Sequence, residues 1–207
     1  MRVSVSFLLD AEDMNRRYGI IALIVVISLV GCVPLWVNTY YSPNAEGGTV
    51  KKSQCNETAG PPDMIEFVRN DVSIGVKVTD MGDQLSVFVQ VQIPKNREVR
   101  LLNGIVFVSI PSNSAPLEGL LNPIIYHDQS PWSIGDAMVG ETREFKGIFR
   151  SLFLGKFYGM EAKIKAPKSD VLKVRIPEFE INGQKVELPE ITFTRDKSME
   201  VFGPVNC

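Results

Sequence analysis

The sequence predicts a mostly β protein: an antiparallel, immunoglobulin-like β-sandwich that follows one N-terminal apolar segment. Three observations carry this prediction. Apolar and polar residues alternate over several short stretches, as they do in strands buried on one face only. Turn residues such as Gly, Asn, Asp and Pro separate these stretches, at spacings typical of a sandwich. A long uncharged run lies near the N-terminus, at residues 18–37.

Size and charge narrow the function classes. The chain has 207 residues, with 24 acidic and 22 basic side chains and a formal net charge of -2. This length fits one domain with an appendage. A chain with this balance lacks the basic surface that nucleic-acid binding needs, so we expect no nucleic-acid partner. Hydrophobic residues make up 44% of the chain, which excludes a wholly disordered protein.

The apolar segment predicts attachment to a membrane. Residues 18–37 contain no charge, and as a helix they would span the bilayer core of roughly 30 Å. Arg16 and Arg17 precede the segment, and the next basic residue after it is Lys51. This asymmetry holds the N-terminus in the cytoplasm by the positive-inside rule. We therefore expect a short cytoplasmic region at 1–17, a transmembrane helix at 18–37 and the remaining chain outside the cytoplasm.

A second interpretation of the same segment is a bacterial lipoprotein signal. Residues 29–31 are Leu, Val and Gly and precede Cys32, a pattern that resembles the lipobox, in which the Cys is acylated and becomes the new N-terminus. Met14 as the true start would give the short basic region that such a signal needs. The apolar and aromatic residues after Cys32 favour the spanning helix. Both interpretations stay open, and Cys32 is the lipidation candidate.

Two further cysteines predict a disulfide. With Cys32 in the membrane or lipidated, Cys55 and Cys207 form an even pair in an oxidising compartment. A bond between them would close a loop of about 150 residues, which the chain-entropy model values at roughly 5 kcal/mol.

The part beyond the membrane is divided into a tether and a domain. Residues 38–63 are rich in Asn, Ser, Thr, Gly and Pro, which predicts a flexible tether. In the domain at 64–207, the alternation of residues 72–79 and 85–93 predicts a β-hairpin. The apolar run at 104–110 predicts a central strand covered on both faces. Further strands are expected at 171–176, on both sides of the type I′ turn Asn182-Gly183 within 179–188, and at 191–193.

Two stretches of the domain are less regular. Residues 112–144 show no clear period, and a loop of this length is either partly structured or functional. Phe residues recur every fourth position between Phe145 and Phe157, which favours strands with rings in the core and a bend near Gly155. The alternative is an aromatic strip exposed to a partner or a bilayer surface.

Residues that could carry chemistry are few. His127 is the one His in the chain and has no catalytic or zinc-binding motif around it, so we interpret it as solvated or structural. We expect no catalytic residue, no metal site and no cofactor. Asp128 and Asp136 are the candidates for an alternative function, in which paired carboxylates would hydrolyse a substrate.

Basic residues concentrate between 146 and 175, and acidic residues between 176 and 200. One interpretation is that these are solvated or mutually attracting sheet faces. The other is a cationic patch that docks an acidic envelope protein, a polysaccharide or a lipid headgroup. Its candidate residues are Lys163, Lys165, Lys173 and Arg175.

Together these features predict a membrane-anchored binding or structural module in the periplasm or outside the cell, belonging to a bacterial envelope. The anchor and the tether support this location, and the missing catalytic motifs favour a non-enzyme. The alternative function is an envelope hydrolase that uses paired carboxylates.

Overall fold

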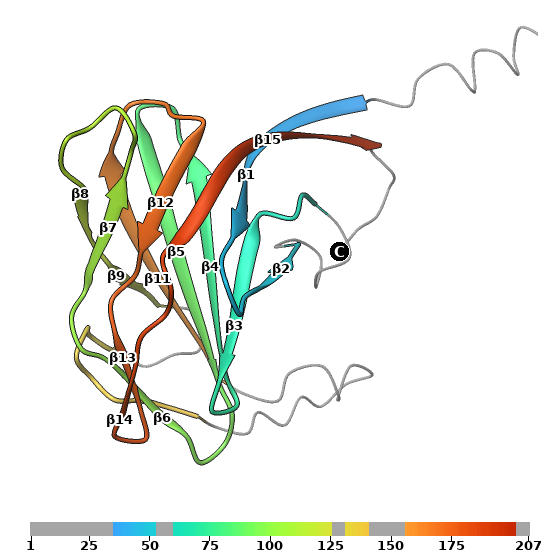
Figure 1. Ribbon diagram of the computed structural model, residues 1–207. Coiled ribbons are helices and arrows are strands. Elements are labelled where there is room, and N and C mark those ends of the chain that lie inside the picture. The colour runs from blue at the N-terminus through green and yellow to red at the C-terminus, as the bar shows by residue number, and fades with distance from the viewer. Residues whose placement is uncertain (1–34, 53–59, 126–130, 141–155, 202–207) are drawn as a thin grey trace, which may run out of the picture. The chain divides into compact units, whose positions relative to one another are not determined.

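The structure is a computed structural model that describes residues 35–52, 60–125, 131–140 and 156–201. The described residues form strands and turns without a helix, so the protein is mostly β with antiparallel sheets, as predicted (Figure 1). In these ranges no helix is long and apolar enough to cross a membrane. The chain divides into two compact units, and residues 37–198 belong to one of them. For the other unit, the structure describes only strand ends at 35–36 and 199–201.

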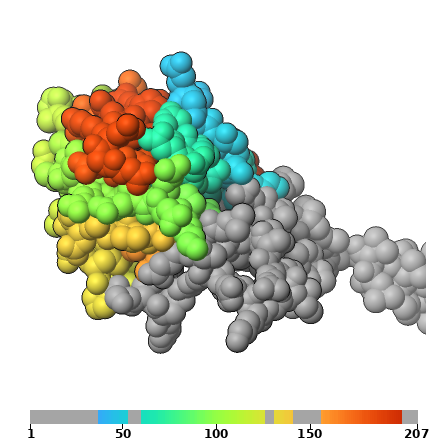
Figure 2. Space-filling view, turned by 90° about the horizontal axis from the view of Figure 1, so that it is seen from below, coloured from blue at the N-terminus to red at the C-terminus, as the bar shows by residue number. Residues whose placement is uncertain are grey.

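The strands form three sheets. The five-stranded sheet has the order β1 (Leu35–Asn44), β15 (Ile191–Val201), β12 (Val171–Arg175), β7 (Ile105–Ser109) and β8 (Leu117–Leu120). The six-stranded sheet has the order β2 (Thr49–Lys51), β3 (Met64–Arg69), β4 (Val72–Asp80), β5 (Gln84–Ile93), β11 (Lys156–Lys165) and β9 (Asn122–Ile124). The four-stranded sheet has the order β10 (Met138–Val139), β6 (Glu98–Leu101), β13 (Phe179–Ile181) and β14 (Gln184–Val186). Figure 2 shows this last sheet on one face, with yellow β10, green β6 and the red hairpin side by side.

One hydrophobic core joins the sheets. Every second residue of β4 and β5 is buried in it, because a strand turns successive side chains to opposite faces. The five-stranded sheet packs closely on the six-stranded sheet. A Cβ atom at Gly119 of β8 would lie 2.4 Å from Ile164 Cγ1 of β11, so a larger residue at 119 would clash. Side chains from both sheets therefore interdigitate across the core.

The two predicted hairpins are confirmed. In the β4–β5 turn, the Met81 amide donates to the Gln84 carbonyl at 2.9 Å, and the Gly82 amide donates to Asp80 Oδ1 at 2.8 Å. In the β13–β14 turn, Asn182 and Gly183 have φ values of 50° and 80°. Two consecutive positive φ values are what a type I′ turn requires.

The prediction that residues 104–110 form a strand covered on both faces is wrong. In β7, Val106 and Val108 are buried, but Ile105 on the other face is 38% exposed. On that outer face the Arg175 guanidinium lies over the Phe107 ring, 4.9 Å from its centroid. Apolar residues on an outer face can be covered by a cationic side chain, so the sequence of β7 shows the same continuous apolar pattern as a strand that is buried on both faces.

The prediction of a flexible tether over residues 38–63 is wrong where β1 and β2 lie. Tyr41 in β1 is 1% exposed, and its hydroxyl donates to the Ser169 carbonyl at 2.8 Å. Residues 35–37 also belong to β1, so the predicted membrane helix does not reach residue 37. Residues 18–34 lie outside the described part of the chain. A polar composition concealed β1 because this strand pairs with β15, which is remote in sequence. The strand β2 pairs with the nearby β3, but its three residues are too few to show a period.

The long irregular stretch 112–144 is partly structured, because it contains β8, β9 and β10. The Phe repeat lies outside the described residues except for Phe157, which is half-buried in β11. The strand β11 begins at Lys156, and the predicted bend near Gly155 lies outside the described residues.

Tyr41 makes the free energy of unfolding decrease at alkaline pH. Burial, followed by the neighbouring Asp80 charge, raises the pKa of the Tyr41 hydroxyl above its ordinary value. The folded state then holds this proton more tightly than the unfolded chain, whose tyrosines titrate near pH ~10. The stabilisation is complete below that pH and is lost as pH rises through the folded-state pKa. We expect the free energy of unfolding to fall less steeply above pH ~10 in Tyr41→Phe than in the unaltered protein.

The measurement is urea unfolding followed by circular dichroism at several pH values, with both proteins in the same buffers. Deprotonation of lysines affects both equally, so the difference between the two slopes isolates Tyr41. Equal slopes would contradict the assignment.

Candidate ligand-binding face

The candidate site lies on the outer face of the six-stranded sheet. Residues paired directly across neighbouring strands point to the same face of a sheet. Met64 pairs with Lys77, Lys77 with Phe88, Phe88 with Glu161, and Glu161 with Asn122. These five residues form one row across β3, β4, β5, β11 and β9, which we call the cross-strand row. Their sequence neighbours on β4 and β5, such as Val76 and Val87, point into the core.

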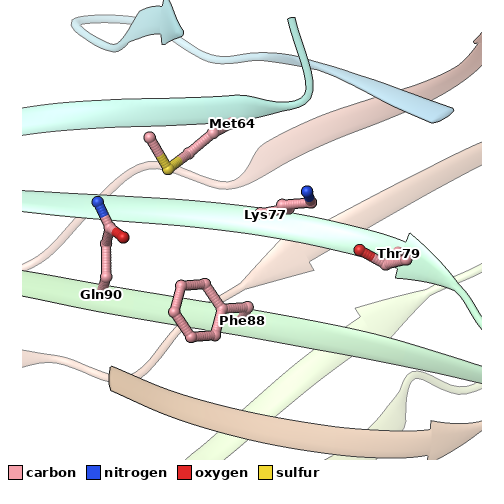
Figure 3. Close-up of a pocket in the computed structure, with 5 residues that line it drawn as sticks. All are labelled: Met64, Lys77, Thr79, Phe88 and Gln90. Atoms are coloured by element: carbon pink, nitrogen blue, oxygen red, sulfur yellow. The ribbon is translucent and has the colours of Figure 1, made fainter. Parts of the chain in front are cut away.

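A hollow of about 240 Å³ opens on the β3–β5 side of this row. In Figure 3 the Phe88 ring and the Gln90 amide project from β5, and Lys77 and Thr79 project from the adjacent β4. Met64 of β3 completes the lining. The wall therefore combines an aromatic ring and a thioether with an amide, a hydroxyl and an ammonium group.

Glycines shape the surroundings of Gln90. The residues paired with it on the two neighbouring strands are Gly75 and Gly159. A Cβ atom at Gly75 would come within 2.9 Å of Gln90 Cγ. The missing side chain therefore gives the stem of Gln90 room to lie close to the sheet, with its amide beside the hollow.

A second hollow of about 370 Å³ opens on the β11–β9 side of the row. Its lining residues are Leu120, Asn122, Pro123, Ile124, Glu161 and Lys163. Glu161 is held in place on both oxygens: Ser86 Oγ donates to Oε1 at 2.6 Å, and Lys163 Nζ lies 3.6 Å from Oε2. Phe88 and Glu161 thus lie side by side between the two hollows.

The charged residues that line the two hollows are balanced in pairs. Lys77 Nζ lies 2.7 Å from Oδ2 of Asp63, a residue only 4% exposed. Lys163 is matched by Glu161 at 3.6 Å. A nearly buried carboxylate is stable when a cation partners it, so Asp63 requires Lys77 to stay in this position.

The four residues of the predicted cationic patch do not come together. Lys163 and Lys165 lie on β11 of the six-stranded sheet, whereas Lys173 and Arg175 lie on β12 of the five-stranded sheet. Both pairs point away from the shared core, so they occupy outer faces of different sheets. Lys173 is also paired with Glu190 at 3.1 Å. A single patch of these four residues is therefore not formed.

Of the two candidate carboxylates, the structure describes only Asp136. Asp136 closes a local turn, where its Oδ2 accepts from the Ser133 amide at 2.7 Å and its own amide donates to the Ser133 carbonyl at 3.0 Å. Asp128 and His127 lie outside the described residues. The lipidation candidate Cys32 and the disulfide candidates Cys55 and Cys207 lie outside them as well. Within the described ranges, no group of three or more His, Cys, Asp or Glu residues could hold a metal ion.

Two of the five residues in the cross-strand row, Lys77 and Phe88, lie on the hairpin that the sequence predicted, beside Thr79 and Gln90 of the first hollow. Lys77, Thr79, Phe88 and Gln90 are the outward residues of the confirmed β4–β5 hairpin, so their common face follows from its register. The placement of β11 beside β5 had no comparable signal, and with it Glu161 was missed. Comparisons with protein-family models, with curated proteins and with solved structures found no match to this chain.

Proposed function

We propose that this protein is a membrane-anchored binding module on the extracytoplasmic side of a bacterial cell envelope, and that it binds through the cross-strand row. The observation that carries the binding role is the pair of hollows on either side of Phe88 and Glu161. Binding sites typically combine apolar walls with a few fixed polar groups, and this row has both.

The anchor and the finer fold are parts of the same proposal. The uncharged run at 18–37 after Arg16 and Arg17 supports an N-terminal anchor, as a spanning helix that ends before β1 or as a lipid on Cys32. The single core shared by the five-stranded and six-stranded sheets supports an immunoglobulin-like β-sandwich.

A reporter fused after Cys207 tests the location. Alkaline phosphatase needs an oxidising compartment to become active, so we expect an active fusion in bacterial cells. A green fluorescent protein fused at the same site is expected to stay dark, because the proposed location carries it out of the cytoplasm. As a matched control, phosphatase fused after Arg17, before the apolar segment, should be inactive. An inactive phosphatase fusion together with a fluorescent green fluorescent protein fusion at Cys207 would refute the proposed location.

A further inference from the structure

We infer that the ligand of the cross-strand row is a neutral oligosaccharide, such as a segment of an envelope polysaccharide. This inference rests on the proposed function, because it names the ligand class of the same face. Three properties of the row support it: the kinds of groups present, their charge balance and the direction in which they are arranged.

The groups match those of a sugar. A sugar ring presents C–H groups on its faces and hydroxyls on its rim, and each hydroxyl both donates and accepts hydrogen bonds. The half-buried Phe88 ring offers an apolar surface for such a face. Around it, the amides of Gln90 and Asn122 and the hydroxyl of Thr79 can both donate and accept, and the Glu161 carboxylate accepts.

The charge balance favours a neutral ligand. A site for phosphate or an acidic headgroup needs cations that are not already neutralised. The cations that line the two hollows are matched by carboxylates, Lys77 by Asp63 and Lys163 by Glu161. An anionic ligand would have to compete with Asp63, which is nearly buried and depends on its ion pair. A neutral polyhydroxyl ligand leaves both pairs intact.

The direction of the row favours an extended ligand that crosses the strands. From Lys77 to Asn122 the row passes over three strand spacings, a length of roughly 14 Å. The two hollows lie on either side of the Phe88–Glu161 pair, so adjacent units of one chain can occupy them together. A peptide strand would instead pair with the edge of a sheet, whereas Phe88 lies on β5, between β4 and β11.

The test uses the full chain in detergent micelles and a panel of immobilised neutral oligosaccharides built from hexose and N-acetylhexosamine units. We expect saturable binding to at least one member. Phe88→Ala should weaken that binding about tenfold or more, since a lost aromatic contact worth about 1.4 kcal/mol changes affinity by that factor. Phe88→Tyr should retain it. Gln90→Ala, which leaves the ring in place, should also weaken it.

Phe107→Ala is the matched control, because it removes a half-buried ring from the outer face of the five-stranded sheet. It should bind as the unaltered protein does, and circular dichroism should show that every variant is folded. Inorganic phosphate and vesicles of anionic lipid are the competing probes. Binding to these alone, binding to no sugar, or sugar binding unchanged in both Phe88→Ala and Gln90→Ala would overturn the inference.

These failures differ from failure of the proposed function. If the phosphatase fusion is active and a non-sugar ligand is lost in Phe88→Ala but kept in Phe107→Ala, the face is a binding site with a different ligand. An inactive fusion would remove the envelope location whatever the sugar panel shows.

Discussion

Phe193→Ala is expected to lower the free energy of unfolding by about 3–5 kcal/mol, the usual loss for a fully buried Phe. Phe193 is 0% exposed and lies in β15, directly opposite Leu172 of β12. Its ring fills the core between the sheets, so truncation removes buried apolar area and leaves a cavity. Urea unfolding followed by circular dichroism measures the loss as a lower midpoint at an unchanged slope.

Phe107→Ala provides the comparison within the same sheet. Phe107 is only half-buried and packs under Arg175 on the outer face, so its truncation leaves a groove that water can fill. We expect a clearly smaller loss than for Phe193→Ala. Equal losses in the two variants would contradict the placement of Phe193 in the core and Phe107 outside it.

Local patterns in the sequence predicted the hairpins, and the physical reason is that a hairpin is a local structure. The β4–β5 pair is encoded by alternation on both sides of a turn with Gly82 at positive φ. The strand β1 has no such local signal. It depends on pairing with β15, more than a hundred residues later in the chain, and composition alone therefore suggested a tether.

The same distinction explains the outcome at the candidate site. Lys165 and Lys173 are close in sequence, yet their strands enter different sheets, so the cationic patch was wrong. Phe88 and Glu161 are far apart in sequence but directly opposite each other in the sheet. The register of β11 on β5 follows from tertiary packing, and no short-range pattern specifies which residues it brings together.

Gly119→Ala is the second prediction with a large effect. The added Cβ would lie 2.4 Å from Cγ1 and 2.7 Å from Cδ1 of Ile164, and 3.2 Å from the Ala162 Cβ. These atoms belong to β11, so the methyl group would push the two sheets apart or force Ile164 from its rotamer. Overpacking of this kind typically costs about 1–3 kcal/mol of unfolding free energy. Gly82→Ala is the comparison variant: nothing lies within 4 Å of the added Cβ, so any loss of stability there comes from the positive φ of residue 82 and not from a clash.

A double-mutant cycle with Ile164→Ala shows whether the clash is the cause. Ile164→Ala alone removes a buried side chain and should cost about 2–5 kcal/mol. It also removes both atoms nearest to the new methyl group. We therefore expect Gly119→Ala to destabilise the Ile164→Ala protein much less than the unaltered protein, with a coupling energy of about 0.5–3 kcal/mol. Additive losses would mean that Gly119 is required for its own backbone conformation, and that β8 does not press on β11 at this point.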